Sequence, residues 1–278
     1  MKKLLAVSAV TLVFIIAVFA TSRQLTIKGS DTMVHLASIW AENHMKDNRG
    51  PQISVTGGGS GTGIAALLNG TTDICAASRK IKEKEIKLAE KKGIKPVEHV
   101  VARDGIAVVI NPGNQVDELT IEQIGKIYTG AITNWKQVGG PDQKIIVFSR
   151  ESSSGTYVFF QKKVLNKQDY TPKARLMPAT SAIIKAASED KWSIGYVGLG
   201  YAVKAGGKVK VLKVKSGPDS PAVSPSEATV VDGSYSIARP LHLYTKGEPE
   251  GEVKKFLDYC FSPEGQKVVR ETGYVPVK

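Results

Sequence analysis

The run Val55-Thr56-Gly57-Gly58-Gly59-Ser60-Gly61-Thr62-Gly63, with the apolar residues 64–68 behind it, indicates the kind of fold most directly. A β-branched segment leads into a glycine-rich turn, and the apolar run after the turn ends at Asn69-Gly70. The order strand, tight turn, helix is typical of α/β proteins. Such a turn collects unpaired backbone N–H groups, small hydroxyls and the positive end of a helix dipole at one spot. That combination favours the binding of an anion.

The same order of residues occurs twice more in the chain. Ile27-Lys28-Gly29-Ser30-Asp31-Thr32 lies near the beginning, and Phe148-Ser149-Arg150-Glu151-Ser152-Ser153-Ser154-Gly155-Thr156 lies near the middle. Each segment by itself would be ordinary capping of a helix N-terminus. Three of them in one α/β chain predict turns that converge on a single oxyanion site.

Strand-like runs alternate with helical periodicity almost to the end of the chain, which predicts an α/β fold. Met33, Leu36, Ala37 and Trp40 recur at the spacing of one apolar helix face. The expected strands cover residues 24–28, 52–56, 73–76, 106–110, 144–148, 194–197 and 236–245.

Local signals mark the ends of several helices. Thr120 with Gln123 forms a capping box, and Ser262-Pro263 predicts an N-cap followed by proline at the first helical position. The stretch 80–95 holds seven lysines and three glutamates, and we interpret it as a solvated helix or helix pair rather than a binding patch. Residues 216–226 contain three prolines and predict an irregular connection.

Composition narrows the function classes. The chain has 278 residues, 42% of them hydrophobic and 23% charged, so it is not a disordered tail, a collagenous repeat or a polytopic membrane protein. Its formal net charge of +12 is compatible with nucleic acid, an anionic membrane or a small anion as partner. Its two cysteines, Cys75 and Cys260, exclude a zinc ribbon and a disulfide scaffold, and they leave open a single disulfide or two buried thiols.

The N-terminus predicts export. Lys2 and Lys3 precede an apolar run over residues 4–19, and Val18-Phe19-Ala20 offers the small residues of a cleavage site. This is the layout of a secretory signal peptide over residues 1–20. The alternative is an uncleaved membrane anchor, because the run approaches the length of a spanning helix.

Other nucleotide and catalytic motifs fail on spacing. No glycine-rich turn carries the lysine of a Walker sequence, and the loose dinucleotide pattern at residues 61–66 lacks its acidic partner. Ser60 is not a nucleophile elbow, because Thr62 replaces the second glycine of that motif. The four histidines, 35, 44, 99 and 242, show no metal spacing, so we expect no metal site, no catalytic residues and no cofactor.

Two arginines and one aspartate add charge to the neutral turns. Arg79 follows the strand that ends at Ser78, and Arg150 lies within the third turn. A guanidinium can hold two oxygens of a tetrahedral anion, whereas the alternative for each arginine is a surface salt bridge. Asp104, in Arg103-Asp104-Gly105, either caps a turn before an apolar strand or faces the ligand.

At this point the chain resembles the periplasmic phosphate-binding proteins, which are the substrate-binding subunits of ATP-driven phosphate importers. The matching stretches follow the family's order over most of residues 25–278, and the most specific is Arg150 with Ser153-Ser154-Gly155-Thr156. The other matching stretches are residues 29–33, 58–63, 73–79, 103–108, 127–130 with Trp135, and 195–198.

The resemblance implies a two-lobed α/β fold of the periplasmic-binding-protein type, with phosphate in the cleft between lobes that two hinge strands join. It places lobe I at residues 21–110 plus 232–278 and lobe II at residues 111–231. It also implies a monomeric, periplasmic binding protein that delivers inorganic phosphate to membrane permease subunits, with no enzymatic activity and no nucleic-acid partner.

Residue by residue, the resemblance implies a phosphate ligand set. It comprises Thr32, the backbone of Met33, Ser60, Arg150, Ser154, Gly155 and Thr156, with Ser30 as a weaker candidate. Arg79 is a candidate ligand from its charge and position alone. One departure matters, because better-known members have an aspartate where this chain has Arg79. We therefore expect Asp104 to take the place of that proton-accepting carboxylate. A binding protein for sulfate, molybdate or tungstate is an alternative function, and an exported phosphate-ester hydrolase is another.

Overall fold

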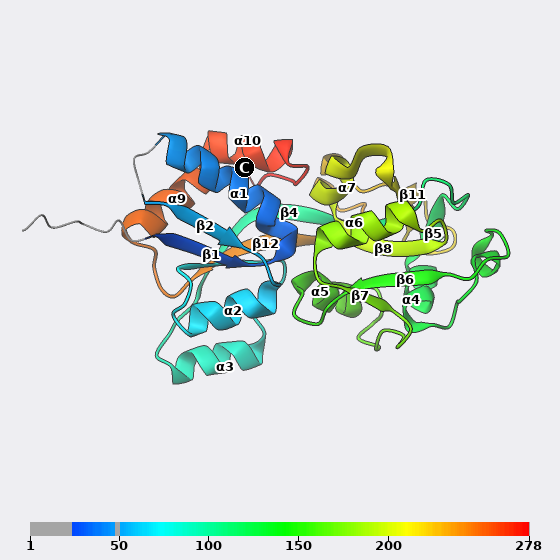
Figure 1. Cartoon of the computed structure of the whole chain (residues 1–278), viewed down its shortest axis with the longest axis horizontal. Coiled ribbons are helices and arrows are strands. Elements are labelled where there is room, and N and C mark those ends of the chain that lie inside the picture. The colour runs from blue at the N-terminus through cyan, green and yellow to red at the C-terminus, as the bar shows by residue number, and fades with distance from the viewer. Residues whose placement is uncertain (1–23, 48–50, 278) are drawn as a thin grey trace, which may run out of the picture.

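Strands and helices alternate along the chain in the computed structural model, which describes residues 24–47 and 51–277 (Figure 1). The predicted signal peptide lies outside these residues. The elements up to the first long strand are β1 (Leu25–Gly29), α1 (Asp31–Asp47), β2 (Ile53–Thr56), α2 (Ser60–Leu68), β3 (Ile74–Ala77), α3 (Glu83–Lys91) and β4 (Val97–Ile110).

The middle of the chain forms a second group of elements, and the last segment returns to the first group. The middle elements are β5 (Glu118–Thr120), α4 (Ile121–Thr129), the 3-10 helix η1 (Trp135–Val138), β6 (Ile146–Arg150), α5 (Gly155–Lys163), β7 (Arg175–Met177), α6 (Thr180–Glu189), β8 (Ser193–Gly198), α7 (Leu199–Ala205), η2 (Gly206–Lys208), β9 (Lys210–Val211), β10 (Lys213–Lys215), β11 (Ala222–Val223) and α8 (Glu227–Val231). The returning elements are β12 (Ala238–Thr245), α9 (Gly251–Phe261) and α10 (Pro263–Glu271).

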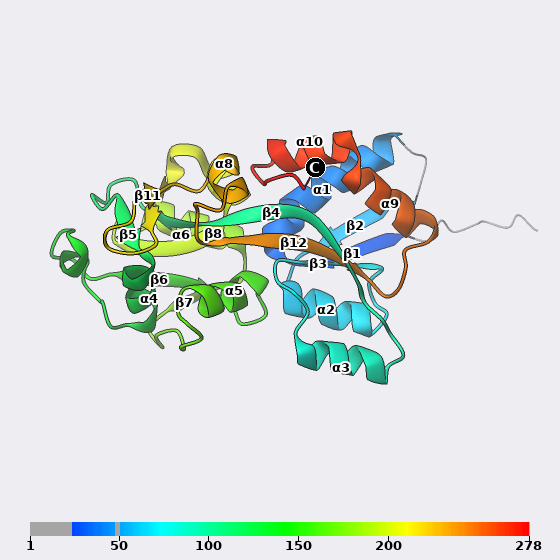
Figure 2. The ribbon, with the colours of Figure 1, turned by 180° about the vertical axis from the view of Figure 1, so that it is seen from behind.

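One sheet runs through both groups in the order β2-β1-β3-β12-β4-β8-β6-β7, with β9 paired to β4. The pairs β1–β2, β1–β3, β6–β8 and β6–β7 are parallel, as expected where helices connect the strands. β4 and β12 are antiparallel neighbours, and Figure 2 shows them side by side where the chain passes between the two groups. The parallel strands of both groups, β1–β3 and β6–β8, have their carboxyl ends toward the middle of the molecule (Figure 1).

Two apolar cores show where the lobes lie. One core contains Trp40 of α1 and Phe256 of α9, and the other contains Trp135 and Phe160 of α5. On β4, Ala102 belongs to the first core and Ile106 to the second, so the strand changes lobes at residues 103–105. The returning chain changes lobes between Ile237, which directly precedes β12, and Leu241 within it. The division predicted from the sequence, at residues 110 and 232, stays a prediction.

The predicted α/β class is confirmed, and most predicted elements are present with small shifts of their ends. The Thr120–Gln123 capping box opens α4, and Ser262 caps α10, which begins at Pro263. The expectation that Asp104 precedes a strand was wrong, because β4 begins at Val97 and Asp104 lies within it. The residues 97–105 lack the apolar run that marks the second half of the strand.

Cys75 and Cys260 are buried free thiols that lie in different apolar clusters. Burial raises the pKa of both thiols well above the ordinary value, which keeps them protonated and unreactive. No helix among residues 24–47 and 51–277 is long and apolar enough to cross a membrane.

Candidate functional site

The glycine-, serine- and threonine-rich turns meet at the boundary between the lobes. Ser30 at the end of β1 donates from Oγ to Oγ of Ser78, at 2.8 Å. Ser60, the first residue of α2, accepts the backbone N–H of Ser78 at 3.0 Å. All three serines are almost completely buried. The carboxyl ends of β1 and β3 and the beginning of α2 thus gather these hydroxyls in one place.

A second pair of hydroxyls joins the two lobes. Oγ1 of Thr32 in α1 lies 2.8 Å from Oγ1 of Thr156 in α5. Arg239 of β12 donates from Nη2 to the same Thr156 oxygen at 3.0 Å, and either hydroxyl can be the donor in the Thr32–Thr156 bond. Arg239 also donates from Nη1 to the carbonyl oxygen of Ser78, at 2.8 Å. The hydroxyl cluster and the crossing strand are therefore connected.

The N-terminus of α5 faces this cluster. Ser154 is its N-cap and accepts the N–H groups of Thr156 and Tyr157 at 3.2 and 3.3 Å. A Cβ atom on Gly155 would collide with the Ser60 and Ser78 hydroxyls, so only glycine permits this approach. The first N–H groups of a helix have no partner within the helix, and they carry positive partial charge.

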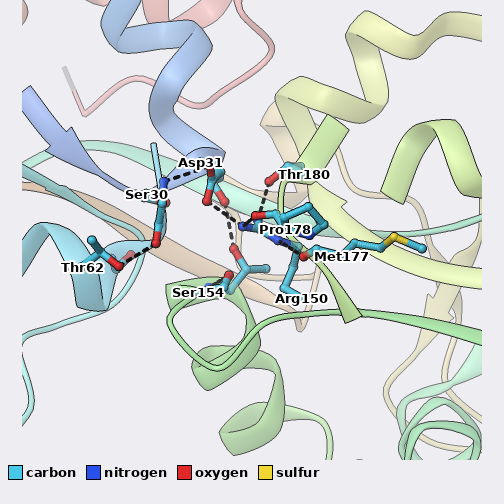
Figure 3. Close-up of polar contacts among 12 residues, drawn as sticks. Ser30, Asp31, Thr62, Arg150, Ser154, Met177, Pro178 and Thr180 are labelled. Atoms are coloured by element: carbon cyan, nitrogen blue, oxygen red, sulfur yellow. Dashed lines mark hydrogen bonds and ion pairs between the residues drawn. The ribbon is translucent and has the colours of Figure 1, made fainter. Parts of the chain in front are cut away.

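Arg150, at the end of β6, has a buried guanidinium that is almost fully hydrogen-bonded (Figure 3). It donates from Nε to the carbonyl oxygen of Met177 at 3.1 Å and from Nη1 to Oγ1 of Thr180 at 2.8 Å. Its Nη2 donates to Pro178 O at 2.9 Å and to Oδ2 of Asp31 at 2.6 Å. A guanidinium has five N–H donors, so one on Nη1 is not used by these bonds.

Asp31 supplies the charge opposite Arg150 from the other lobe. Figure 3 shows the two side chains pointing toward one another from α1 and β6. The other carboxylate oxygen of Asp31, Oδ1, accepts the N–H of Gly58 at 3.2 Å. The backbone carbonyl oxygen of Asp31 accepts a hydrogen bond from Oη of Tyr201 at 2.9 Å. The side chains of Asp31 and Arg150 are only 13% and 2% exposed, so water screens the pair poorly.

Asp104 forms a completely buried ion pair with Arg239 where β4 and β12 cross between the lobes. Its Oδ2 accepts Nη2 and Nε of Arg239 at 2.9 and 3.2 Å, and its Oδ1 accepts the N–H of Leu199 at 2.9 Å. Burial raises the pKa of Asp104 and lowers that of Arg239, and their mutual attraction opposes both shifts. Both carboxylate oxygens of Asp104 are therefore held by the protein itself.

Arg79 and Met33 lie beside the cluster with partners of their own. Arg79 donates from Nη1 and Nη2 to the two oxygens of Glu85, both at 2.8 Å, and this bond lowers the pKa of Glu85 against the effect of burial. The backbone N–H of Met33 donates to Ser30 O at 2.9 Å, and its side chain lies in the first core. The remaining residues predicted to bind the ligand, Ser30, Thr32, Ser60, Arg150, Ser154, Gly155 and Thr156, converge between the lobes, with Asp104 behind them.

Three residues of this region were not predicted from the sequence. Ser78 and Asp31 stand within the quoted stretches, and only their neighbours were proposed as ligands. Arg239 was not considered, because its partner Asp104 is 135 positions away in the sequence. One signal was available in the sequence. Arg239, Leu241 and Leu243 occupy alternate positions of β12, so their side chains point to the same side of the strand, and both leucines are buried.

A tetrahedral oxyanion can be held here by hydrogen bonds and charge. The donors around this point are hydroxyls, the first N–H groups of α5, and the guanidinium groups of Arg150 and Arg239. Within the described part of the chain, no group of three or more His, Cys, Asp and Glu side chains could hold a metal ion. The arrangement has no serine–histidine pair among the residues that converge here. It is suited to binding rather than to hydrolysis.

Comparison with known families gives a consistent result. A sequence model described as the PBP superfamily domain matches residues 19–264. The phosphate-binding protein PstS of Staphylococcus epidermidis is 36% identical over 254 residues, which cover 89% of this chain and 77% of that protein. PstS of Staphylococcus aureus is 35% identical over 253 residues, with coverage of 89% and 76%.

Solved structures share the two-lobed α/β fold. A candidate phosphate ABC transporter substrate-binding protein from Clostridium perfringens, crystallised with bound phosphate, superimposes with a TM-score of 0.82 and 32% identity over 92% of this chain and 100% of that chain. An ABC-type phosphate transport receptor from Vibrio cholerae has a TM-score of 0.71 and 29% identity, with coverage of 90% and 99%.

Proposed function

We propose, from the premise that this chain belongs to the PstS phosphate-binding proteins of the PBP superfamily, that it captures inorganic phosphate between its lobes for ATP-driven import. It is a binding protein and not an enzyme. The observation that carries the proposal is the meeting of Thr32, Ser60 and the α5 N-terminus beside the Arg150 guanidinium.

Phosphate would be held by the converging groups of both lobes. The proposed ligands are the hydroxyls of Ser30, Thr32, Ser60, Ser154 and Thr156, the first N–H groups of α5 at Gly155, the Met33 backbone, and the guanidinium of Arg150, with Arg79 at the margin. The Thr32 and Thr156 hydroxyls bond each other, and those of Ser30 and Ser60 bond Ser78. The Ser154 hydroxyl accepts helix N–H groups. These hydroxyls would turn from these partners to phosphate oxygens. Neutral donors supply most of the contacts, and Arg150 supplies the charge.

Discrimination against sulfate requires an acceptor for the proton that phosphate carries near neutral pH. A carboxylate accepts a hydrogen bond from protonated phosphate and repels fully ionised sulfate. We propose Asp31 for this role, because its carboxylate lies beside Arg150 of the other lobe and, unlike that of Asp104, is not completely buried. Asp104 is the alternative, and its bonds to Arg239 within the crossing strands count against it.

The lobe boundary and the partners follow from the same premise. The lobes would hinge at residues 103–105 and 238–240, where β4 and β12 pass between the two cores. The closed form would be the signal that membrane permease subunits recognise. The apolar N-terminus supports export by a signal peptide to the periplasm or cell exterior, where the protein would act as a monomer.

Calorimetric titration with phosphate, sulfate, molybdate and tungstate tests the function. We expect phosphate to bind tightest, and Arg150→Ala to lose about 2–5 kcal/mol of its binding free energy because a buried anion loses its charged partner. Arg270→Ala, an exposed arginine of α10, is the matched control and should bind phosphate like the parent. Preferred binding of another oxyanion would refute the phosphate assignment, and an unchanged Kd for Arg150→Ala would remove Arg150 from the site.

A further inference from the structure

A groove of about 750 Å³ lies beside the proposed phosphate site and has walls from both lobes. Its floor is the crossing segment of β12, from Ala238 to His242. One wall is the segment 79–82 of the first lobe, and the other is α5 with Asn166 of the second lobe. Figure 2 shows α5 of the second lobe facing α2 and α3 of the first, and the segment 79–82 leads from β3 into α3.

Every ionisable side chain that lines the groove is basic. They are Arg79, Lys80, Lys82, Lys162, Lys163, Arg239 and His242. Arg79 and Arg239 are neutralised by Glu85 and Asp104, and Lys80 lies 3.9 Å from Glu98. Lys82, Lys162 and Lys163 have no ion pair within 4.0 Å among the described residues. The groove therefore carries unneutralised positive charge on both walls.

One buried donor that lines the groove lacks an acceptor. The Nε atom of Arg79, a side chain only 7% exposed, has no hydrogen-bond acceptor among the described residues. A buried N–H without an acceptor costs folding free energy. A ligand that accepts from Nε would remove this cost, and so would a movement of the guanidinium toward such a ligand.

We propose that this groove is a second anion site, distinct from the phosphate site, that binds a condensed inorganic phosphate such as pyrophosphate. Lys82 lies on one wall and Lys162 and Lys163 on the other, so an anion with more than one phosphoryl group can be held from both sides at once. Lysine binds phosphoryl oxygens as a mobile point charge, which suits an extended anion of variable length. The groove is too small for a folded protein domain but large enough for several phosphoryl units.

Because one wall belongs to each lobe, the bound polyanion would favour the closed arrangement. Phosphate in the proposed site favours the same arrangement, so each ligand would strengthen the binding of the other. Arg79 borders both sites. The sites differ in their lysines, since none of the three unpaired lysines belongs to the proposed phosphate ligands. The interpretation of residues 80–95 as a solvated helix still describes α3, and Lys82 precedes it.

The test is calorimetric titration of pyrophosphate into the full chain saturated with phosphate. We expect binding that is tighter with phosphate present than without it, and weaker at high ionic strength. The triple variant Lys82→Gln, Lys162→Gln, Lys163→Gln should bind pyrophosphate about tenfold more weakly or worse, since each lost pair contributes up to about 1 kcal/mol. A thermal unfolding transition and a phosphate Kd equal to those of the parent would show that the triple variant is folded.

The matched control removes three exposed lysines elsewhere, Lys173→Gln, Lys208→Gln and Lys213→Gln, and should leave pyrophosphate binding unchanged. Arg150→Ala separates the two sites, because it should lose phosphate but bind pyrophosphate like the phosphate-free parent. The proposal is overturned if pyrophosphate fails to bind the saturated protein, if it displaces phosphate, or if the triple variant binds it as the parent does.

Discussion

Asp31 and Arg150 come from different lobes and form an almost buried ion pair at the proposed ligand site. A phosphate that binds between the lobes must therefore share Arg150 with Asp31 or displace it. The protonated oxygen of phosphate can donate to the Asp31 carboxylate, whereas sulfate has no proton to offer. At the scale of single residues, the role proposed for Asp31 would make the choice between the two anions depend on this carboxylate.

Replacing Asp31 with Asn tests that choice. An amide can donate to sulfate and removes the repulsion, so we expect the preference for phosphate over sulfate to fall about tenfold or more, as for a charged hydrogen bond worth about 1.5–3 kcal/mol. Competition titration with sulfate measures the ratio. Asp258→Asn on the exposed face of α9 is the control. An unchanged ratio in Asp31→Asn would exclude the role.

Replacing Asp104 with Asn should act on stability. The change leaves Arg239 buried without its counter-ion, which costs about 3–5 kcal/mol in comparable buried pairs. Urea unfolding of Asp104→Asn at neutral pH measures the loss. A stable Asp104→Asn protein with a reduced preference for phosphate over sulfate would instead assign the proton-accepting role to Asp104.

His242 gives the folded protein a predictable response to acid. Burial lowers the pKa of His242 to about 4, although Glu98 Oε1, 2.9 Å from its Nδ1, opposes the shift. Between pH 6.5 and 4 the unfolded chain binds a proton that the folded chain does not, so stability falls as the pH falls.

The pH dependence of unfolding in His242→Asn measures this contribution. We expect the parent to lose about 3 kcal/mol more than His242→Asn across the window from pH 6.5 to 4, since each pKa unit corresponds to about 1.4 kcal/mol. Equal slopes for the two proteins would show that His242 titrates normally in the folded state.

At the scale of elements, the N-terminus of α5 has both a structural role and a proposed binding role. Ser154 caps the helix and is a proposed phosphate ligand, whereas Ser262 caps α10 away from the site. Ser154→Ala and Ser262→Ala should each lose about 1 kcal/mol of unfolding free energy. Only Ser154→Ala should weaken phosphate binding, by about 1.5–3 kcal/mol. Equal phosphate affinities in the two variants would show that Ser154 caps the helix and does not bind phosphate.

Much of the element pattern was predictable, because it is encoded locally. The helix α1 follows from the spacing of Met33, Leu36 and Trp40, and the α4 capping box follows from two residues three positions apart. The first half of β4 was not predictable, since residues 97–103 mix exposed and buried side chains without an apolar run. Its pairing with β12 over the whole length supplies the missing stability.

At the scale of the whole molecule, the lobes are in contact through the bonds from Gly61 N to Ser153 O, from Leu199 N to Asp104 and from Thr32 to Thr156. These contacts describe a closed arrangement. The connecting strands β4 and β12 are the elements about which it would open.

Small-angle scattering tests this motion. We expect the radius of gyration to decrease when phosphate is added to the ligand-free protein, and the phosphate-bound curve to match the closed structure. Arg150→Ala should show no such change at the same phosphate concentration. A parent curve that is identical with and without phosphate would contradict closure on the ligand.

The sequence by itself determined the α/β class, the three anion-binding turns and most of the residues that converge between the lobes, because helix caps and glycine turns are local properties of the chain. Only the tertiary structure decided which charges meet. Arg79 pairs with Glu85, Arg150 with Asp31 and Arg239 with Asp104, and the last two pairs join residues 119 and 135 positions apart. Such pairings depend on strand register and lobe contact, which no local pattern encodes.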